Sequence, residues 1–127
     1  MPNRDSLSVL LPQDEISNSV AYATVSPLTI NPANNVVIPN ALDNKDNSLA
    51  IFISNSASDD KNATILKSNL YPNALLGDLV LSIPKSSTVC IQLSDPSRFE
   101  QKNGDILIDF QDGFSGSVYA VAKKAGL

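Results

Sequence analysis

Few side chains of this sequence have the chemistry that enzymes need. The chain contains no histidine and a single cysteine, which removes the usual Ser-His-Asp and Cys-His arrangements that activate a nucleophile. The neighbouring carboxylates Asp59 and Asp60 are expected at a turn tip, where they cannot face each other across a cleft as the paired acids of glycosidases do. No glycine-rich phosphate loop and no dinucleotide fingerprint occurs in the sequence. We therefore expect no catalytic residue, and a protein that is not an enzyme.

Metal and cofactor sites have equally little support. The segment 43–47, Asp-Asn-Lys-Asp-Asn, faintly resembles a calcium loop. However, Lys45 occupies an alternate ligand position, and no glycine or bidentate glutamate follows at the required distance, so a solvated turn is the preferred interpretation. Cys90 lies in an apolar run, which favours a small buried hydrophobe over a reactive thiol. We expect no metal and no cofactor.

The distribution of charge bears on the partners that the chain can bind. Its formal charge is −4, and its lysines and arginines are scattered, which disfavours nucleic acid because phosphate backbones need clustered cations. No apolar run approaches the roughly 20 residues that span a bilayer, so no membrane partner is expected. Met1 is not followed by an apolar run, which predicts synthesis in the cytoplasm without a signal peptide.

Short strands are the elements that would have to position any site. Apolar residues recur at every second position over 79–83, 89–93, 106–110 and 117–122, which is the pattern of half-buried strands. These four strands predict a meander or half of a sandwich. Upstream, residues 48–55 predict a strand with 63–66 as its hairpin partner, and alternation over 20–25 predicts another. No helical spacing extends over ten residues, and the best helix is one turn within 94–101.

Together these patterns predict an all-β fold of about eight to ten short strands, as an antiparallel β-sandwich or a jelly-roll-like barrel. Residues 1–12 are expected to form an extended N-terminal arm or an edge strand, and residues 13–127 a single sandwich domain. Phe52 and Phe110 are predicted in the core. Phe114, between glycines, is equally compatible with a plug that folds back and with a partner contact.

The order of these features along the sequence is also similar to that of a known protein family. An apolar strand ending in Asn, a polar turn and a second strand come first, followed by a strand ending in Pro, a small-residue turn and another strand. A Pro-Ser-aromatic bend, an Asn-Gly turn and a last strand follow; the segments are 49–55, 63–65, 78–84, 87–93, 95–99, 103–110 and 116–121. In this order the chain resembles the small head-decoration (cement) proteins of tailed bacteriophages over roughly residues 49–122.

The resemblance implies a structural virion protein that binds the outer surface of a phage head and stabilises it. Its partner is then the major capsid protein, its assembly a homotrimer, and its location the capsid surface. The interface is expected from the N-terminal arm, the bend at 94–104 and one sandwich edge. The expected partner-binding residues are Leu7, Val9, Leu10, Asp95, Pro96, Arg98, Phe99 and Phe114.

A receptor- or glycan-binding β-module of a virion fibre is the alternative. Sugar sites usually stack an aromatic side chain on the ring, and the sequence contains no tryptophan, which counts against this alternative. An enzyme with carboxylate chemistry on the same scaffold is the least favoured hypothesis, because histidine and a phosphate loop are both absent from the sequence.

Overall fold

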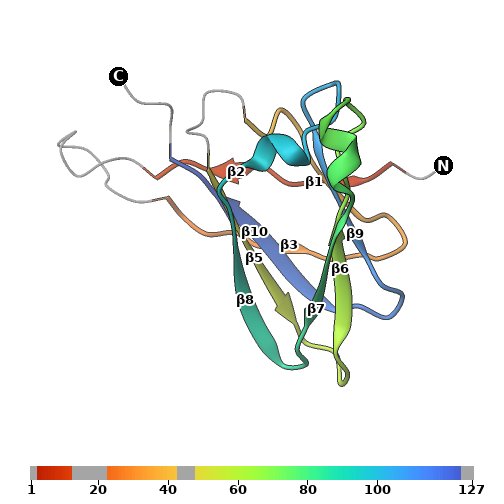
Figure 1. Ribbon diagram of the computed structural model, residues 1–127. Helices are drawn as coiled ribbons and strands as arrows, with labels where there is room; N and C mark the ends of the chain where they lie inside the picture. Colours follow the sequence, from red (N-terminus) through yellow and green to blue (C-terminus); the bar gives the residue numbers. More distant parts are fainter. Residues whose placement is uncertain (1–2, 13–22, 43–47, 124–127) are drawn as a thin grey trace, which may run out of the picture.

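Two five-stranded β-sheets pack face to face in the computed structural model, which describes residues 3–12, 23–42 and 48–123 (Figure 1). The first sheet has the spatial order β1 (Asp5–Ser6), β4 (Val36–Ile38), β9 (Ile106–Phe110), β6 (Lys61–Ile65) and β7 (Leu79–Ile83). The second sheet has the order β2 (Val9–Leu10), β10 (Gly116–Val121), β5 (Leu49–Asn55) and β8 (Ser87–Leu93), with β3 (Leu28–Thr29) also paired to β10. The predicted all-β sandwich is confirmed.

The strands pair in a nested order. β3 pairs with β10, β4 with β9, β5 with β8 and β6 with β7, and all four pairs are antiparallel. The strands from β7 onward therefore alternate between the two sheets, and the prediction that they form a meander is wrong. The predicted hairpin of 48–55 with 63–66 is also wrong, because β6 pairs with β7 and β9 in the other sheet.

An aliphatic core fills the space between the sheets. Every second residue of β5 and of β9 is buried, and these positions carry Ile, Leu and Phe side chains except at Asn55, the last residue of β5. Full burial of such a side chain stabilises the fold by roughly 1.5–3 kcal/mol. Phe110 lies in this core as predicted, and Phe114 packs edge-on against it with ring centroids 4.9 Å apart. Phe114 is therefore a plug at the end of the sandwich.

Two residues predicted inside face outward instead. Phe52 is only partly buried and stacks on Tyr119 on the outer face of the second sheet, with ring centroids 4.6 Å apart. Cys90 is exposed on the same face. The physical reason is parity: in β5 and β8 the odd-numbered residues face the core, and side chains of a strand alternate strictly between faces. β5 is apolar at almost every position and does not reveal this parity, whereas in β8 the alternation of apolar residues with Thr88 and Gln92 does reveal it.

The N-terminal residues are edge strands and do not form a free arm. β1 pairs in parallel with β4, and β2 pairs in parallel with β10, so residues 5–10 cross from one sheet to the other (Figure 1). Leu7, between the two strands, is 4% exposed, and its N–H donates to Val37 O at 2.8 Å. Of the two expectations for residues 1–12, an extended arm or an edge strand, the structure therefore shows the edge strand. This segment closes one side of the sandwich.

Two short 3-10 helices complete the described chain, namely η2 (Asn73–Leu76) and η3 (Pro96–Arg98). The helical turn predicted within 94–101 is confirmed at η3. Of the predicted strand at 20–25, residues 23–25 are not in a strand, and the other positions lie outside the described residues. The calcium-like segment 43–47 also lies outside them.

Candidate binding surface

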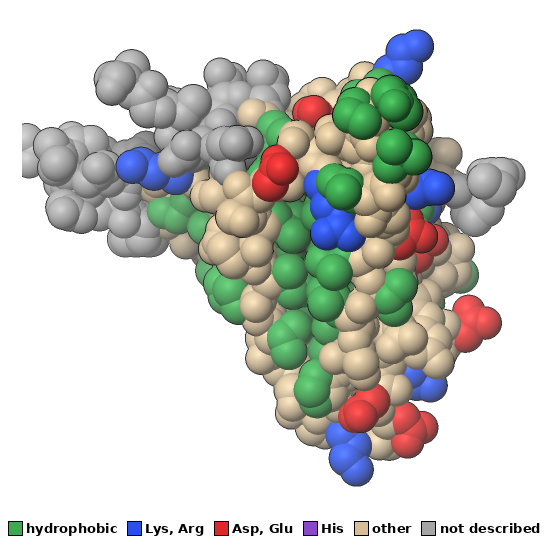
Figure 2. All heavy atoms as spheres, in the orientation of Figure 1, with side chains coloured by type: hydrophobic (Ala, Val, Ile, Leu, Met, Phe, Trp, Pro, Cys, Tyr) green, Lys and Arg blue, Asp and Glu red, His purple; other side chains and the backbone are tan. Residues whose placement is uncertain are grey.

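The connection between β6 and β7 exposes an unusual amount of apolar surface. Four of its side chains, Leu70, Tyr71, Leu75 and Leu76, are 38%, 83%, 74% and 58% exposed. We call these four residues the apolar tip. They gather at the end of the sandwich where η2 and η3 lie, and Figure 2 shows hydrophobic side chains at this end. Large exposed apolar side chains that cluster on a soluble domain indicate a site for another molecule.

Local structure presents these side chains outward. η2 gives the connection one helical turn, which places Leu75 and Leu76 on the solvent side, and none of its residues is buried. Gly77 ends the turn with φ 77°, a conformation that glycine adopts without a steric penalty. Ser68 is buried, and its N–H donates to Arg98 O at 3.0 Å. The connection is therefore anchored at one end and displayed at the other.

The bend between β8 and β9 holds the apolar tip in place. Arg98 donates hydrogen bonds to Leu76 O at 3.2 Å and to Gly77 O at 3.4 Å, and its guanidinium lies 4.8 Å from the centroid of the Phe99 ring. Asn73 Nδ2 donates to Ser97 O at 3.2 Å. These contacts fix the tip in one conformation, which lowers the entropy cost of binding a partner.

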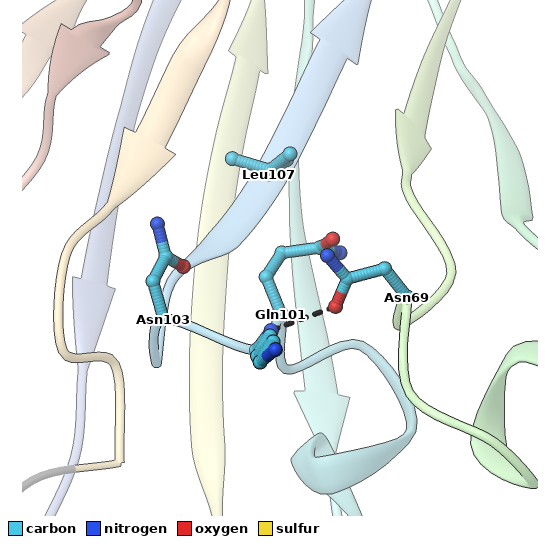
Figure 3. A pocket seen from close by; sticks show the side chains of 5 residues that line it. Asn69, Gln101, Asn103 and Leu107 are labelled. Atoms are coloured by element: carbon cyan, nitrogen blue, oxygen red, sulfur yellow. Dashed lines mark hydrogen bonds between the residues drawn. The ribbon is translucent and has the colours of Figure 1, made fainter.

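An open hollow of about 570 Å³ lies on the outer side of the first sheet, beside this bend. Three amide side chains, together with Lys102 and Leu107, line it; the amides are Asn69, Gln101 and Asn103 (Figure 3). Asn69 Oδ1 accepts from Lys102 N–H at 2.7 Å, and Gln101 Nε2 donates to Lys67 O at 2.8 Å. These two hydrogen bonds therefore join the connection between β6 and β7 to the connection between β8 and β9.

The predicted partner-binding residues fall in three separate places. Leu7, Val9 and Leu10 lie on the edge opposite β7 and β8, whereas Phe114 belongs to the connection between β9 and β10, which lies at the far end from η3 (Figure 1). Only the bend residues adjoin the apolar tip, and they are Asp95, Pro96, Arg98 and Phe99. Four of these residues are buried, namely Leu7, Pro96, Phe99 and Phe114. Their side chains therefore pack inside the domain and do not lie on its surface, where direct contact with a partner was expected.

The apolar tip itself was not among the predicted residues. The signal was present as the run Leu70 to Gly77, which is apolar although it connects two strands. Alternation assigns no face to such a run, because a one-turn helix is too short to show helical spacing. An apolar stretch that belongs to no strand is therefore a sign of surface display here.

Protein-family models, curated proteins and solved structures all give no match to the chain. Within the described residues, no group of three or more acidic, cysteine or histidine side chains is placed to hold a metal ion. In the same part of the chain, no helix has the length and apolar character to cross a membrane. The function is therefore argued from the exposed surface and from the resemblance in the order of sequence features.

Proposed function

We propose that this chain is a structural protein that binds another protein through its apolar tip, and that it decorates a phage head as a cement protein. The observation that carries the protein-binding part of the proposal is the tip: exposed Tyr71, Leu75 and Leu76 on a backbone held by Arg98. The phage head as the binding partner rests on the resemblance in the order of sequence features. Burial of apolar surface contributes roughly 25 cal/mol per Å², and aromatic anchors dominate protein interfaces. The partner in this proposal is the major capsid protein, and the location is the capsid surface.

The nested strand pairing adds support at the level of fold. We propose that β3 to β10 form a jelly roll, because pairing of the first strand with the last, and so on inward, is the order that two Greek keys produce. Jelly rolls occur in viral capsid proteins and in lectins. The fold thus suits a virion protein, and it suits the glycan-binding alternative as well.

The amide-lined hollow is the observation that favours the glycan-binding alternative. Amide side chains suit sugar hydroxyls, but no aromatic residue lines this hollow. If the chain is a glycan-binding module, a glycan array gives binding that Gln101→Ala abolishes and that Leu75→Asp leaves unchanged. The decoration proposal predicts the opposite pattern on phage heads.

Co-sedimentation with expanded heads tests the decoration proposal. These heads are assembled from the major capsid protein of the genome that encodes the chain. Leu75→Asp is expected to weaken binding at least tenfold, about 1.4 kcal/mol, because it places a charge in an apolar contact. The matched control is Val80→Asp, since Val80 is an exposed apolar residue on β7 outside the tip. Equal binding of Leu75→Asp and the wild type would refute the role of the tip.

A further inference from the structure

A second feature of the molecule is the outer edge of β8, which no other strand among the described residues pairs with. Both sheets end on the same side, the first with β7 and the second with β8. Natural proteins protect such edges with short strands, charges or proline. The other edge strands β1, β2 and β3 have two residues each, and β7 is flanked by Asp78 and Pro84. β8 has seven residues, Ser-Thr-Val-Cys-Ile-Gln-Leu, without a charge or a proline.

The backbone groups that face this open edge follow from the hydrogen bonds of the sheet. Ser56 N–H donates to Ser115 O, and successive residues of a strand direct their N–H and C=O groups to opposite sides. The even-numbered residues of β5 therefore bond to β10, and the odd-numbered ones bond to β8. Because Ile51 pairs with Ile91, the odd-numbered residues of β8 are used inside the sheet. The residues that direct their backbone groups to the open edge are Thr88, Cys90 and Gln92.

We propose that two copies of this chain pair through β8, antiparallel and about a two-fold axis at Cys90. Cys90 is the central residue of the strand, so each Cys90 lies opposite Cys90 of the second copy. Thr88 then faces Gln92, and Val89 faces Ile91, which matches polar with polar and apolar with apolar. No like charges meet across the axis, because β8 carries none. The three outward residues supply about six backbone hydrogen bonds.

The apolar residues beside this edge also favour pairing with a second copy of the chain. Leu79 and Leu81 of β7, and Val89 and Ile91 of β8, pack on the core but are only partly buried. Figure 2 shows hydrophobic side chains in rows between these two strands on the side where the sandwich is open. Edge-to-edge pairing places the open sides of the two copies against each other and removes these rows from water. The pairing is two-fold, so it takes the place of the homotrimer expected from the family resemblance.

Cysteine crosslinking tests the register directly. Opposite Cβ atoms of a hydrogen-bonded antiparallel pair lie about 5.5 Å apart, which is beyond the roughly 3.5–4.5 Å of a relaxed disulfide but within reach of a short bis-maleimide linker. Treatment of the wild type with this linker is expected to give a covalent dimer in high yield. The control is the double variant Cys90→Ser, Ser82→Cys, which carries an exposed thiol on β7 and is expected to remain uncrosslinked. Equal crosslinking of the two proteins would overturn the register.

Light scattering under reducing conditions tests the assembly. The wild type is expected at about 27 kDa, twice the chain mass. Cys90→Lys is expected at the mass of one chain, because it sets two like charges opposite each other, while its exposed position preserves the fold. The control Ser82→Lys on β7 is expected to remain dimeric. A wild-type monomer at 100 µM, a trimer, or a dimeric Cys90→Lys would each overturn the proposal. None of these variants alters the apolar tip, so failure of head binding is a separate outcome.

Discussion

The two ends of the sandwich are built on opposite principles. At the end opposite the tip, the connections 56–60, 84–86 and 111–115 are short and polar, and Figure 2 shows acidic and basic side chains at this end of the molecule. Lys85 N–H donates to Asp60 Oδ1 at 2.9 Å, and Asn62 N–H donates to Gln111 Oε1 at 2.8 Å. At the other end, the connection 66–78 is longer and exposes the apolar tip. We call the polar end the turn end.

The difference indicates that the two ends of the sandwich have different roles. At the turn end, side chains satisfy the backbone groups of neighbouring turns, which fastens the two sheets together. At the tip, polar contacts lie beneath the connection and the apolar groups lie outside. Stability is therefore expected to depend on the turn end, and binding on the tip. Four variants test this comparison, ordered here by the size of their expected effect on the free energy of unfolding.

The largest effect is expected from Gly116→Ala at the turn end. Gly116 has φ 148°, and a Cβ built there would overlap the carbonyl oxygen of Ser54 and lie 2.8 Å from its carbonyl carbon. Because a backbone of the central strand β5 would have to move, we expect a loss of more than about 3 kcal/mol. Urea denaturation measures it. A loss below about 1 kcal/mol would show that the contact relaxes easily.

Asn55→Ala is expected to come next. Asn55 is 2% exposed, and its Nδ2 donates to Asp59 O at 3.1 Å and to Ile83 O at 3.0 Å, while its Oδ1 accepts from Ala57 N–H at 2.9 Å. Loss of these buried bonds is expected to cost about 2–3 kcal/mol. The matched control Asn62→Ala, at an exposed side chain on β6, should change stability by less than about 0.5 kcal/mol. Similar values for both variants would contradict the role of Asn55.

Arg98→Ala is expected to loosen the tip more than the fold. The variant removes the hydrogen bonds to Leu76 O and Gly77 O, so global stability should fall by about 1–2 kcal/mol. Amide hydrogen exchange between residues 70 and 77 should accelerate at least tenfold. The exposed Lys102 gives a control, since Lys102→Ala should leave exchange at the tip unchanged. Unchanged exchange in Arg98→Ala would show that Arg98 does not hold the tip.

Tyr71→Ser is expected to have the smallest effect on stability. Tyr71 is 83% exposed, and exposed substitutions usually change the free energy of unfolding by less than about 0.5 kcal/mol. The same variant is expected to weaken binding to phage heads. A loss of more than about 2 kcal/mol of stability would place Tyr71 in the folded core and would end its interpretation as a binding residue.

The sequence predicted strand positions far better than strand partners. Alternation located β7 to β10 because in each strand the more buried side chains occupy every second position. The pairing of β6 with β9 was hidden, because it joins residues more than forty positions apart. Parity was hidden for Phe52, because apolar residues fill both faces of β5. In β8 the apolar residues alternate with Thr88 and Gln92, and this alternation already places Cys90 on the outer face. Of the candidate surface, the bend at 95–99 was predicted, whereas the tip was missed because its run Leu70 to Gly77 has no strand period.

Hydrogen exchange of the chain, free and bound to expanded heads, tests the central claim that the apolar tip is the binding surface. The amides between Leu70 and Gly77 should exchange more slowly in the bound state, because the partner covers them. The amides of residues 84–86 at the turn end should exchange equally in both states. Protection at the turn end without protection at the tip would contradict the claim.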